Sequence, residues 1–184
     1  MRPLLCAAVA TLLVAAPAGA DDFAPEPGFK LLLSGKDFAG WKAKAAKGGE
    51  PLDGKTEAHK GRFKLTKDGG FVVDPAVKGD VRIETVQEFT KETVIRFDFL
   101  PGAGCNNDLF LLGSKFDINP TQLKMVKVGE WNTMDITASG GTTTFRINGE
   151  TARSDKAKTE KSTFEVRAEF GPMEVRRLRA KTGG

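Results

Sequence analysis

Short stretches in which apolar and polar residues alternate follow one another along most of the chain. Between residues 93 and 100, for example, Ile95, Phe97 and Phe99 fall on one side of an extended strand, and Arg96 and Asp98 fall on the other. No segment keeps an amphipathic helical pattern for three turns. A succession of short strands without helices between them predicts an all-β fold, an antiparallel β-sandwich of the jelly-roll type.

The predicted strands are bounded by Gly, Pro, Asn or Asp, which favour turns. They span residues 63–66, 71–73, 81–86, 93–100, 109–112, 115–118, 133–138, 142–147, 164–170 and 173–179. In the strand at 164–170, alternation places Phe170 in the core and Glu169 outside. The Lys-, Gly- and Ala-rich segment from Trp41 to Gly61 shows little periodicity and predicts a long surface loop. Asn148-Gly149 predicts a tight turn, although the residues after it are not strand-like.

The first residues of the chain have the pattern of a secretory signal peptide. Arg2 precedes an uncharged apolar stretch at residues 4–17, and Ala18-Gly19-Ala20 supplies small residues for cleavage. The apolar stretch is shorter than the roughly 20 residues of a membrane span, so we expect no transmembrane segment. We expect a signal peptide at 1–20 and a single β-sandwich domain at 21–184, secreted to the periplasm or the cell exterior.

Composition excludes several kinds of chemistry. The 184 residues include two Cys and one His, and Cys6 would leave with the signal peptide. A Cys/His zinc site, an internal disulfide and a Cys/His nucleophile pair therefore lack the residues they need. Cys105 is expected to be a small buried residue, and His59, within the Lys-rich segment, to be solvated. The net charge of +4 falls to +3 without Arg2 and is interleaved along the chain, which argues against a nucleic-acid partner.

Several motifs occur in an order that resembles one known family. Residues 28–41 (GFKLLLSGKDFAGW) resemble its opening motif, and residues 129–136 (GEWNTMDI) followed by 145–149 (FRING) give the most specific match. Further matches lie at residues 68–73, 83–89, 94–99, 104–111, 115–118 and 173–179. The family is the 3-keto-disaccharide hydrolase (3-keto-glucoside lyase/hydratase) domain, of the concanavalin A-like lectin and glucanase type. The resemblance implies a secreted jelly roll that breaks down glycosides oxidised at C3.

The chemistry of such a substrate suits a chain with few nucleophiles. A ketone at C3 acidifies the hydrogen at C2, so a base near C2 and a donor near the ketone oxygen can eliminate the group on C1. Water then adds back, and the net reaction is hydrolysis. This route can use an Asp or Glu base and an Arg or Lys donor, and it needs no strong nucleophile.

On this basis we select candidate site residues. The candidates for base or acid are Asp108, Asp117 and Glu169, and those for contacts with the sugar are Asn106, Asn107, Arg96, Lys115, Arg167 and Trp131. Two alternatives stay open: the Asn pair can serve the geometry of a Gly-rich bend, and Trp131 can pack in the core or at its rim. No cofactor is expected. Asn107, Asp108, Asp117 and Asn119 carry the hard oxygen ligands that suit calcium but lack a fixed loop spacing, so no metal ligand is assigned.

The sequence also differs from the family pattern. Only ten residues separate Ile118 from Gly129, where many members carry a longer insert, and Asn107-Asp108 stands in place of Ser-Gly. A non-catalytic carbohydrate-binding module of the same fold is therefore the alternative to an enzyme. Both interpretations predict a carbohydrate partner, and neither predicts an oligomeric state.

Overall fold

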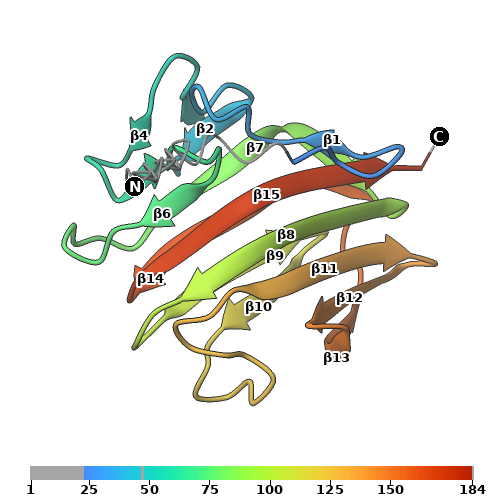
Figure 1. Cartoon of the computed structure of the whole chain (residues 1–184). Helices are drawn as coiled ribbons and strands as arrows, with labels where there is room; N and C mark the ends of the chain where they lie inside the picture. The colour runs from blue at the N-terminus through green and yellow to red at the C-terminus, as the bar shows by residue number, and fades with distance from the viewer. Residues whose placement is uncertain (1–22, 47, 184) are drawn as a thin grey trace, which may run out of the picture.

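Two antiparallel β-sheets lie face to face in this computed structural model, which describes residues 23–46 and 48–183 (Figure 1). The described residues form no helix, and so none that could cross a membrane. The predicted antiparallel β-sandwich is confirmed. The signal peptide predicted at 1–20 lies outside the described residues.

The front sheet of Figure 1, sheet A, has nine strands in the order β13-β12-β11-β8-β15-β6-β5-β4, with β1 paired to the end of β15. Its strands are β1 (Lys30–Leu31), β4 (Glu57–Ala58), β5 (Phe63–Leu65), β6 (Phe71–Val73), β8 (Thr93–Pro101), β11 (Asn132–Ser139), β12 (Thr142–Ile147), β13 (Glu150–Lys156) and β15 (Met173–Thr182). Sheet B lies behind it, in the order β10-β9-β14-β7-β2-β3. Its strands are β2 (Trp41–Lys44), β3 (Gly49–Pro51), β7 (Val81–Thr90), β9 (Asn106–Leu111), β10 (Ser114–Ile118) and β14 (Lys161–Phe170).

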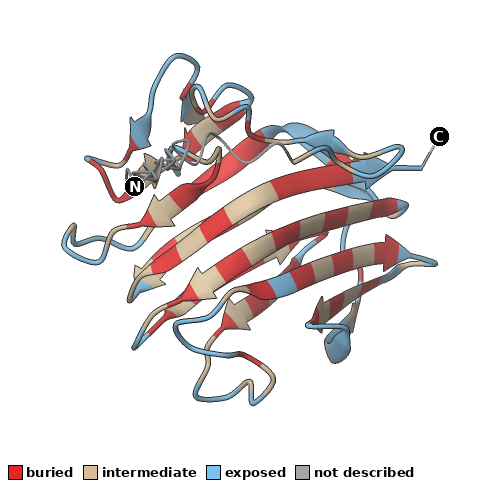
Figure 2. Ribbon diagram, in the orientation of Figure 1, coloured by how far each residue is buried: buried red, intermediate tan, exposed pale blue. Residues whose placement is uncertain are grey.

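The core fills the space between the two sheets. Buried and half-buried residues alternate along the strands, as the bands on β8 and β11 show (Figure 2), and Ile95, Phe97 and Phe99 all point inward as predicted. Phe164 of β14 joins the sheets, because its ring centroid lies 6.3 Å from that of Phe97 in sheet A and 6.4 Å from that of Trp41 in sheet B. Aromatic packing across the sandwich therefore holds the layers together.

The ten predicted strands all form, most of them a few residues longer than expected. The long loop predicted between Trp41 and Gly61 is wrong, because this segment holds β2, β3 and β4. These strands are two to four residues long, too short to show a period in sequence. The residues after Asn148-Gly149, which lack a strand pattern in the sequence, form β13, an edge strand whose residues are all exposed or half-buried. Since neither of its faces is apolar, alternation could not reveal it.

Two asparagines of the most specific sequence match have a structural role. The Asn148 side chain donates to Oδ1 of Asn132 at 2.9 Å and to the Met125 carbonyl at 2.9 Å. Asn148 and Gly149 have φ angles of 52° and 85°, the left-handed geometry of a tight hairpin turn. The motif thus ties the β12–β13 turn to the loop that precedes β11.

Phe170 departs from the prediction. It is 60% exposed, although alternation placed it in the core. Arg167 pairs with Asp108 and Phe170 with Asn106, so β14 has one more residue than β9 between these two pairs. This β-bulge changes the side to which the following side chains point, and it turns Phe170 outward.

We predict that Phe164→Ala lowers the free energy of unfolding by about 3–5 kcal/mol, because it leaves a cavity between the two sheets. The change is measured by urea unfolding of the purified protein. Val86→Ala is the matched control, since Val86 is 56% exposed, and it should change stability by about 0.5 kcal/mol or less. Similar losses in both variants would show that Phe164 does not join the sheets.

Candidate functional site

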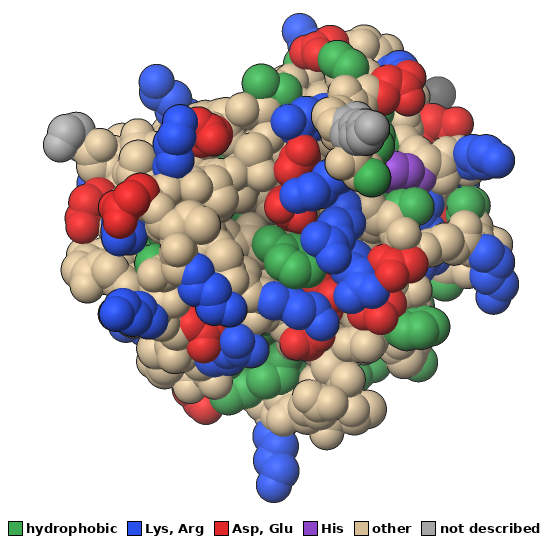
Figure 3. Space-filling view, turned by 180° about the vertical axis from the view of Figure 1, so that it is seen from behind, with side chains coloured by type: hydrophobic (Ala, Val, Ile, Leu, Met, Phe, Trp, Pro, Cys, Tyr) green, Lys and Arg blue, Asp and Glu red, His purple; other side chains and the backbone are tan. Residues whose placement is uncertain are grey.

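The outer face of sheet B carries two adjacent rows of mostly charged side chains, in register from strand to strand. Figure 3 views the molecule from behind and shows blue and red side chains interleaved near the middle of this side. The residues of each row lie directly opposite one another on neighbouring strands. The first row consists of Asp117, Asp108, Arg167 and Arg82. The second consists of Lys115, Phe110, Glu165, Glu84 and Lys42.

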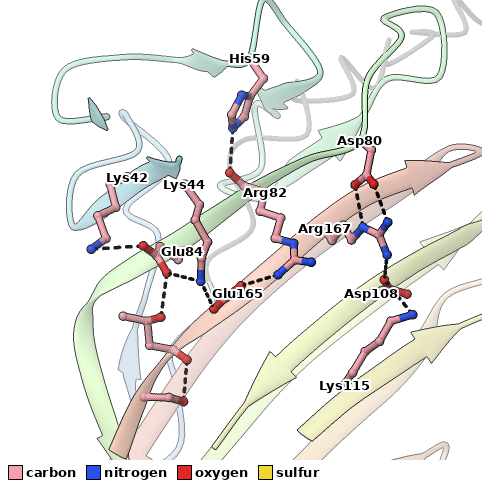
Figure 4. A network of polar contacts seen from close by, with 12 residues as sticks. Lys42, Lys44, His59, Asp80, Arg82, Glu84, Asp108, Lys115, Glu165 and Arg167 are labelled. Atoms are coloured by element: carbon pink, nitrogen blue, oxygen red, sulfur yellow. Dashed lines mark hydrogen bonds and ion pairs between the residues drawn. The ribbon is translucent and has the colours of Figure 1, made fainter. Parts of the chain in front are cut away.

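Arg167 of β14 is the centre of the first row. Its Nε donates to Asp80 at 2.6 Å and its Nη2 to the other oxygen of Asp80 at 2.5 Å, in a two-pronged contact (Figure 4). Its Nη1 donates to Asp108 at 2.7 Å and lies 3.2 Å from Glu169 Oε2. One guanidinium therefore holds carboxylates from β9, from β14 and from the loop before β7.

Lys115 of β10 is the second cation of this group. Its Nζ lies 3.2 Å from Asp108 and 2.5 Å from Asp117. The Lys115 side chain is 43% exposed and that of Asp117 is 37% exposed, whereas the side chain of Asp108 has no exposed surface. We call Asp80, Asp108, Lys115, Asp117, Arg167 and Glu169 the carboxylate cluster. Its four carboxylates share two cations, and only Asp108 is out of reach of a ligand.

The environment drives the pKa values of two neighbouring carboxyls apart. Burial and the adjacent Asp117 raise the pKa of Asp108 above its usual value of 3.8. Partial burial acts to raise the pKa of Asp117, but the hydrogen bonds with Lys115 and Asp108 outweigh it, so this pKa is lowered. Hydrogen bonding to Asp117 raises the pKa of Lys115, which stays a cation at neutral pH. Two carboxyls of different basicity beside a fixed cation are typical of acid–base sites.

The structure thus brings together five of the candidates selected from sequence: Asp108, Asp117, Glu169, Lys115 and Arg167. Asp80 was missed because it lies in a loop with no motif around it. Glu84 and Glu165 were missed too: both bind Lys44, and Glu165 also binds Arg82 at 3.3 Å (Figure 4). The available signal was the alternation of charged and apolar residues, in β7 for Glu84 and in β14 for Glu165.

The two asparagines of the bend have different positions. Asn107 is fully buried, and its Oδ1 accepts a hydrogen bond from the Glu169 backbone N–H at 2.9 Å. Its Nδ2 donates to Cys105 Sγ at 3.4 Å. Asn107 therefore supports the bulge of β14 from inside. Asn106 is half-buried and pairs with Phe170 on the outer face.

Two other candidates lie on the opposite side of the sandwich. Arg96 points outward from sheet A and binds Asp135 through Nε at 2.6 Å. Trp131 is half-buried before β11, and the Arg176 guanidinium lies 3.9 Å from its ring centroid. Neither belongs to the carboxylate cluster. The strands that carry Arg96 and Arg167 look alike in sequence, and only the strand order shows that they belong to different sheets.

A hollow of about 380 Å³ borders the cluster at the end of β14. Its wall includes Asp80 and Glu169 of the cluster, together with Arg62 and Phe170. A larger hollow of about 640 Å³ lies near His59 and Lys44, but none of the five converging candidates lines it. We therefore place the candidate site at the smaller hollow and the exposed part of the cluster.

Cys105 matches its prediction and His59 does not. Cys105 is buried, and burial raises the pKa of its thiol to about 11, which suits a packing role. His59 is half-buried instead of solvated, and its Nε2 lies 2.7 Å from the Arg82 carbonyl oxygen. This hydrogen bond joins the turn after β4 to β7, a contact that the sequence did not predict.

The four oxygen donors considered for calcium all have other partners in the structure. Asn107 is hydrogen-bonded inside the core, and Asn119 Oδ1 accepts bonds from Thr121. Asp108 and Asp117 lie together, but Lys115 bridges them. Over residues 23–46 and 48–183, no group of three or more His, Cys, Asp or Glu side chains has the arrangement of a metal site.

Comparison with known proteins gives matches of structure but not of sequence. No protein-family model and no curated protein matches the sequence. A candidate glycosyl hydrolase from Parabacteroides distasonis shares 17% identity, with a TM-score of 0.63 over 85% of this chain and 95% of that one. The carbohydrate-binding module CBM66 from Bacillus subtilis shares 8% identity, with a TM-score of 0.54 over 78% of this chain and 96% of that one. An alginate lyase shares 10% identity, with a TM-score of 0.53 over 78% and 94%. At these identities the matches show a common jelly-roll fold.

The paired carboxyls lead to a pH prediction. Carbon-13 NMR should show Asp108 titrating above 3.8, and Asp117→Asn should lower that pKa because it removes the neighbouring negative charge. Since the folded protein binds this proton more tightly than the unfolded chain, the contribution of Asp108 to stability should decline as the pH rises through the raised pKa. Asp135→Asn, in the opposite sheet, should leave the titration unchanged. A normal pKa for Asp108 in the wild-type protein would contradict the assignment.

Proposed function

We propose that the protein is a secreted carbohydrate-active β-sandwich that cleaves 3-keto-glycosides by elimination and hydration. The observation that carries the proposal is the convergence of Asp108, Asp117, Glu169, Lys115 and Arg167 on one face. These residues were selected from distant parts of the sequence for the acid–base chemistry of such a substrate. The shared fold of a candidate glycosyl hydrolase, a carbohydrate-binding module and an alginate lyase supports the substrate class.

In this proposal Glu169 is the base. Its side chain is 21% exposed and lines the hollow, whereas Asp108 has no exposed surface through which it could touch a substrate. Lys115, with its exposed ammonium, stabilises the negative charge that develops on the ketone oxygen. Arg167 and Asp108 are positioning residues, which hold Glu169 and Lys115 relative to each other.

The proposed steps balance without a cofactor. Glu169 takes the proton from C2, and negative charge moves to the oxygen on C3. As this enolate collapses, a double bond forms between C1 and C2, the bond from C1 to the glycosidic oxygen breaks, and the departing oxygen takes a proton from water. In the second stage a water oxygen adds to C1 and a proton returns to C2. The products are the 3-keto sugar and the released alcohol or sugar.

One observation favours the non-catalytic alternative. Each carboxylate of the cluster already contacts Arg167 or Lys115, and these contacts lower the pKa values of Asp80 and Asp117. A module that only binds carbohydrate would use these groups as fixed hydrogen-bonding partners for sugar hydroxyls. Turnover separates the two functions, because binding alone releases no product.

We predict that the purified protein, beginning at Asp21, releases glucose from 3-keto-cellobiose but not from cellobiose, because only the oxidised ring has an acidified C2 hydrogen. Glu169→Gln should lower kcat by about 10²–10⁴-fold, the usual contribution of a general base. Chromatography follows the released sugar and the unsaturated 3-keto intermediate.

Glu130→Gln is the matched control, since this exposed carboxylate lies outside the cluster and should keep full activity. Loss of activity in Asp117→Asn but not in Glu169→Gln would show that Asp117 of β10, and not Glu169, is the base. Binding without release from either sugar would support the carbohydrate-binding function and refute the enzyme.

A further inference from the structure

Phe170 is a large aromatic side chain held outside the core next to the candidate site. It is 60% exposed and lines the hollow of about 380 Å³. That volume lies at the small end of the range of about 300–1,000 Å³ found for ligand pockets. Ligand pockets are commonly lined by aromatic side chains together with a few polar groups.

The backbone holds Phe170 in this position. The β-bulge between Arg167 and Phe170 turns the ring outward, and Asn107 binds the Glu169 N–H from within the core. Gly171 follows with a φ of +67°, and a Cβ on it would lie 2.5 Å from the carbonyl of Gly104. Only glycine fits this close approach, so the ring is presented by a fixed turn.

Arg62 fixes the opposite wall of the hollow. It is 3% exposed, and it donates to the carbonyl of Asp74 at 2.6 Å and to that of Glu169 at 3.1 Å. It thereby joins the loop before β7 to the end of β14. Its Nε has no hydrogen-bond partner among the described residues.

The charges that line the hollow balance. Arg62 and Lys78 are cationic, and Asp80 and Glu169 are anionic. A ligand with a net charge would be attracted by the pair of opposite sign and repelled by the pair of like sign. An uncharged ring with many hydroxyl groups can instead donate to the carboxylates and accept from the cations.

We propose that the hollow is a subsite for an uncharged pyranose ring, with Phe170 as the platform on which the ring stacks. The C–H groups of a pyranose carry partial positive charge, which favours the negative face of an aromatic ring. The hydroxyl groups of the same sugar would then reach Asp80 and Glu169. This subsite deepens the proposed function and depends on its assignment of a carbohydrate ligand, but not on catalysis.

Calorimetry with unoxidised cellobiose tests the subsite without any turnover. We expect Phe170→Ala to weaken binding about tenfold and Phe170→Trp to preserve it, because Trp retains an aromatic face. Val86→Ala is the matched control, an exposed apolar residue of the same sheet that lies outside the hollow, and it should bind as the wild type does. Methyl glucuronide should bind more weakly than methyl glucoside.

Equal binding by Phe170→Ala and the wild type, tighter binding of the glucuronide, or no binding of cellobiose by the wild type would each overturn the subsite. The failure of catalysis looks different: cellobiose binds in a manner that depends on Phe170, while 3-keto-cellobiose releases no product. Conversely, if Phe170→Ala changes neither kcat nor KM, the proposed enzymatic activity stands and the role of Phe170 as a stacking platform is refuted.

Discussion

The contact between Arg167 and Asp108 is the interaction on which the candidate site depends. Asp108 has no exposed surface, and a buried carboxylate is costly unless a cation and hydrogen bonds compensate for its lost hydration. Arg167 supplies part of that compensation from the adjacent strand, and it also contacts Asp80 and Glu169. Because one planar group holds carboxylates from three separate segments, moving any of them disturbs the other two. The spacing between Glu169 and Lys115, which are partly exposed, therefore follows from an ion pair whose carboxylate is fully buried.

The second constraint is the bulge at the end of β14. Continued alternation would bury Phe170, and the extra residue opposite β9 prevents this. The bulge leaves the Glu169 N–H without a ladder partner, and the buried side chain of Asn107 accepts this hydrogen bond. A side chain in the core thus determines which residue faces the hollow. This gives Asn107 a role in the site that does not require contact with a ligand.

Alternation predicted the fold well because a long strand with one buried face repeats its pattern several times, as β8 and β14 do. It failed for β2, β3 and β4, which are too short to repeat, and for β13, which buries neither face. The site was predictable only in part. Arg96 and Arg167 each lie between two inward-facing apolar residues, and nothing local distinguishes them, yet strand order places them in opposite sheets. The bulge was also beyond prediction, since Phe170 continues the apolar period of its strand and is displaced only by the pairing with β9.

Charge alone does not mark the site, because both outer faces are rich in ion pairs. On sheet A, Glu26 binds Arg179 through both of its oxygens, and this contact lowers the pKa of Glu26 to about 2. Arg96 likewise binds Asp135. These contacts join one or two carboxylates to each cation, in the manner of the surface pairs that stabilise sheets modestly. Sheet B differs in three respects: four carboxylates share two cations, one of the four is fully buried, and a hollow with an exposed aromatic ring adjoins them. Holding carboxyls of different pKa together beside an accessible cavity costs stability, and a face with a purely structural role does not need it. We therefore assign function to sheet B and a structural role to the charges of sheet A.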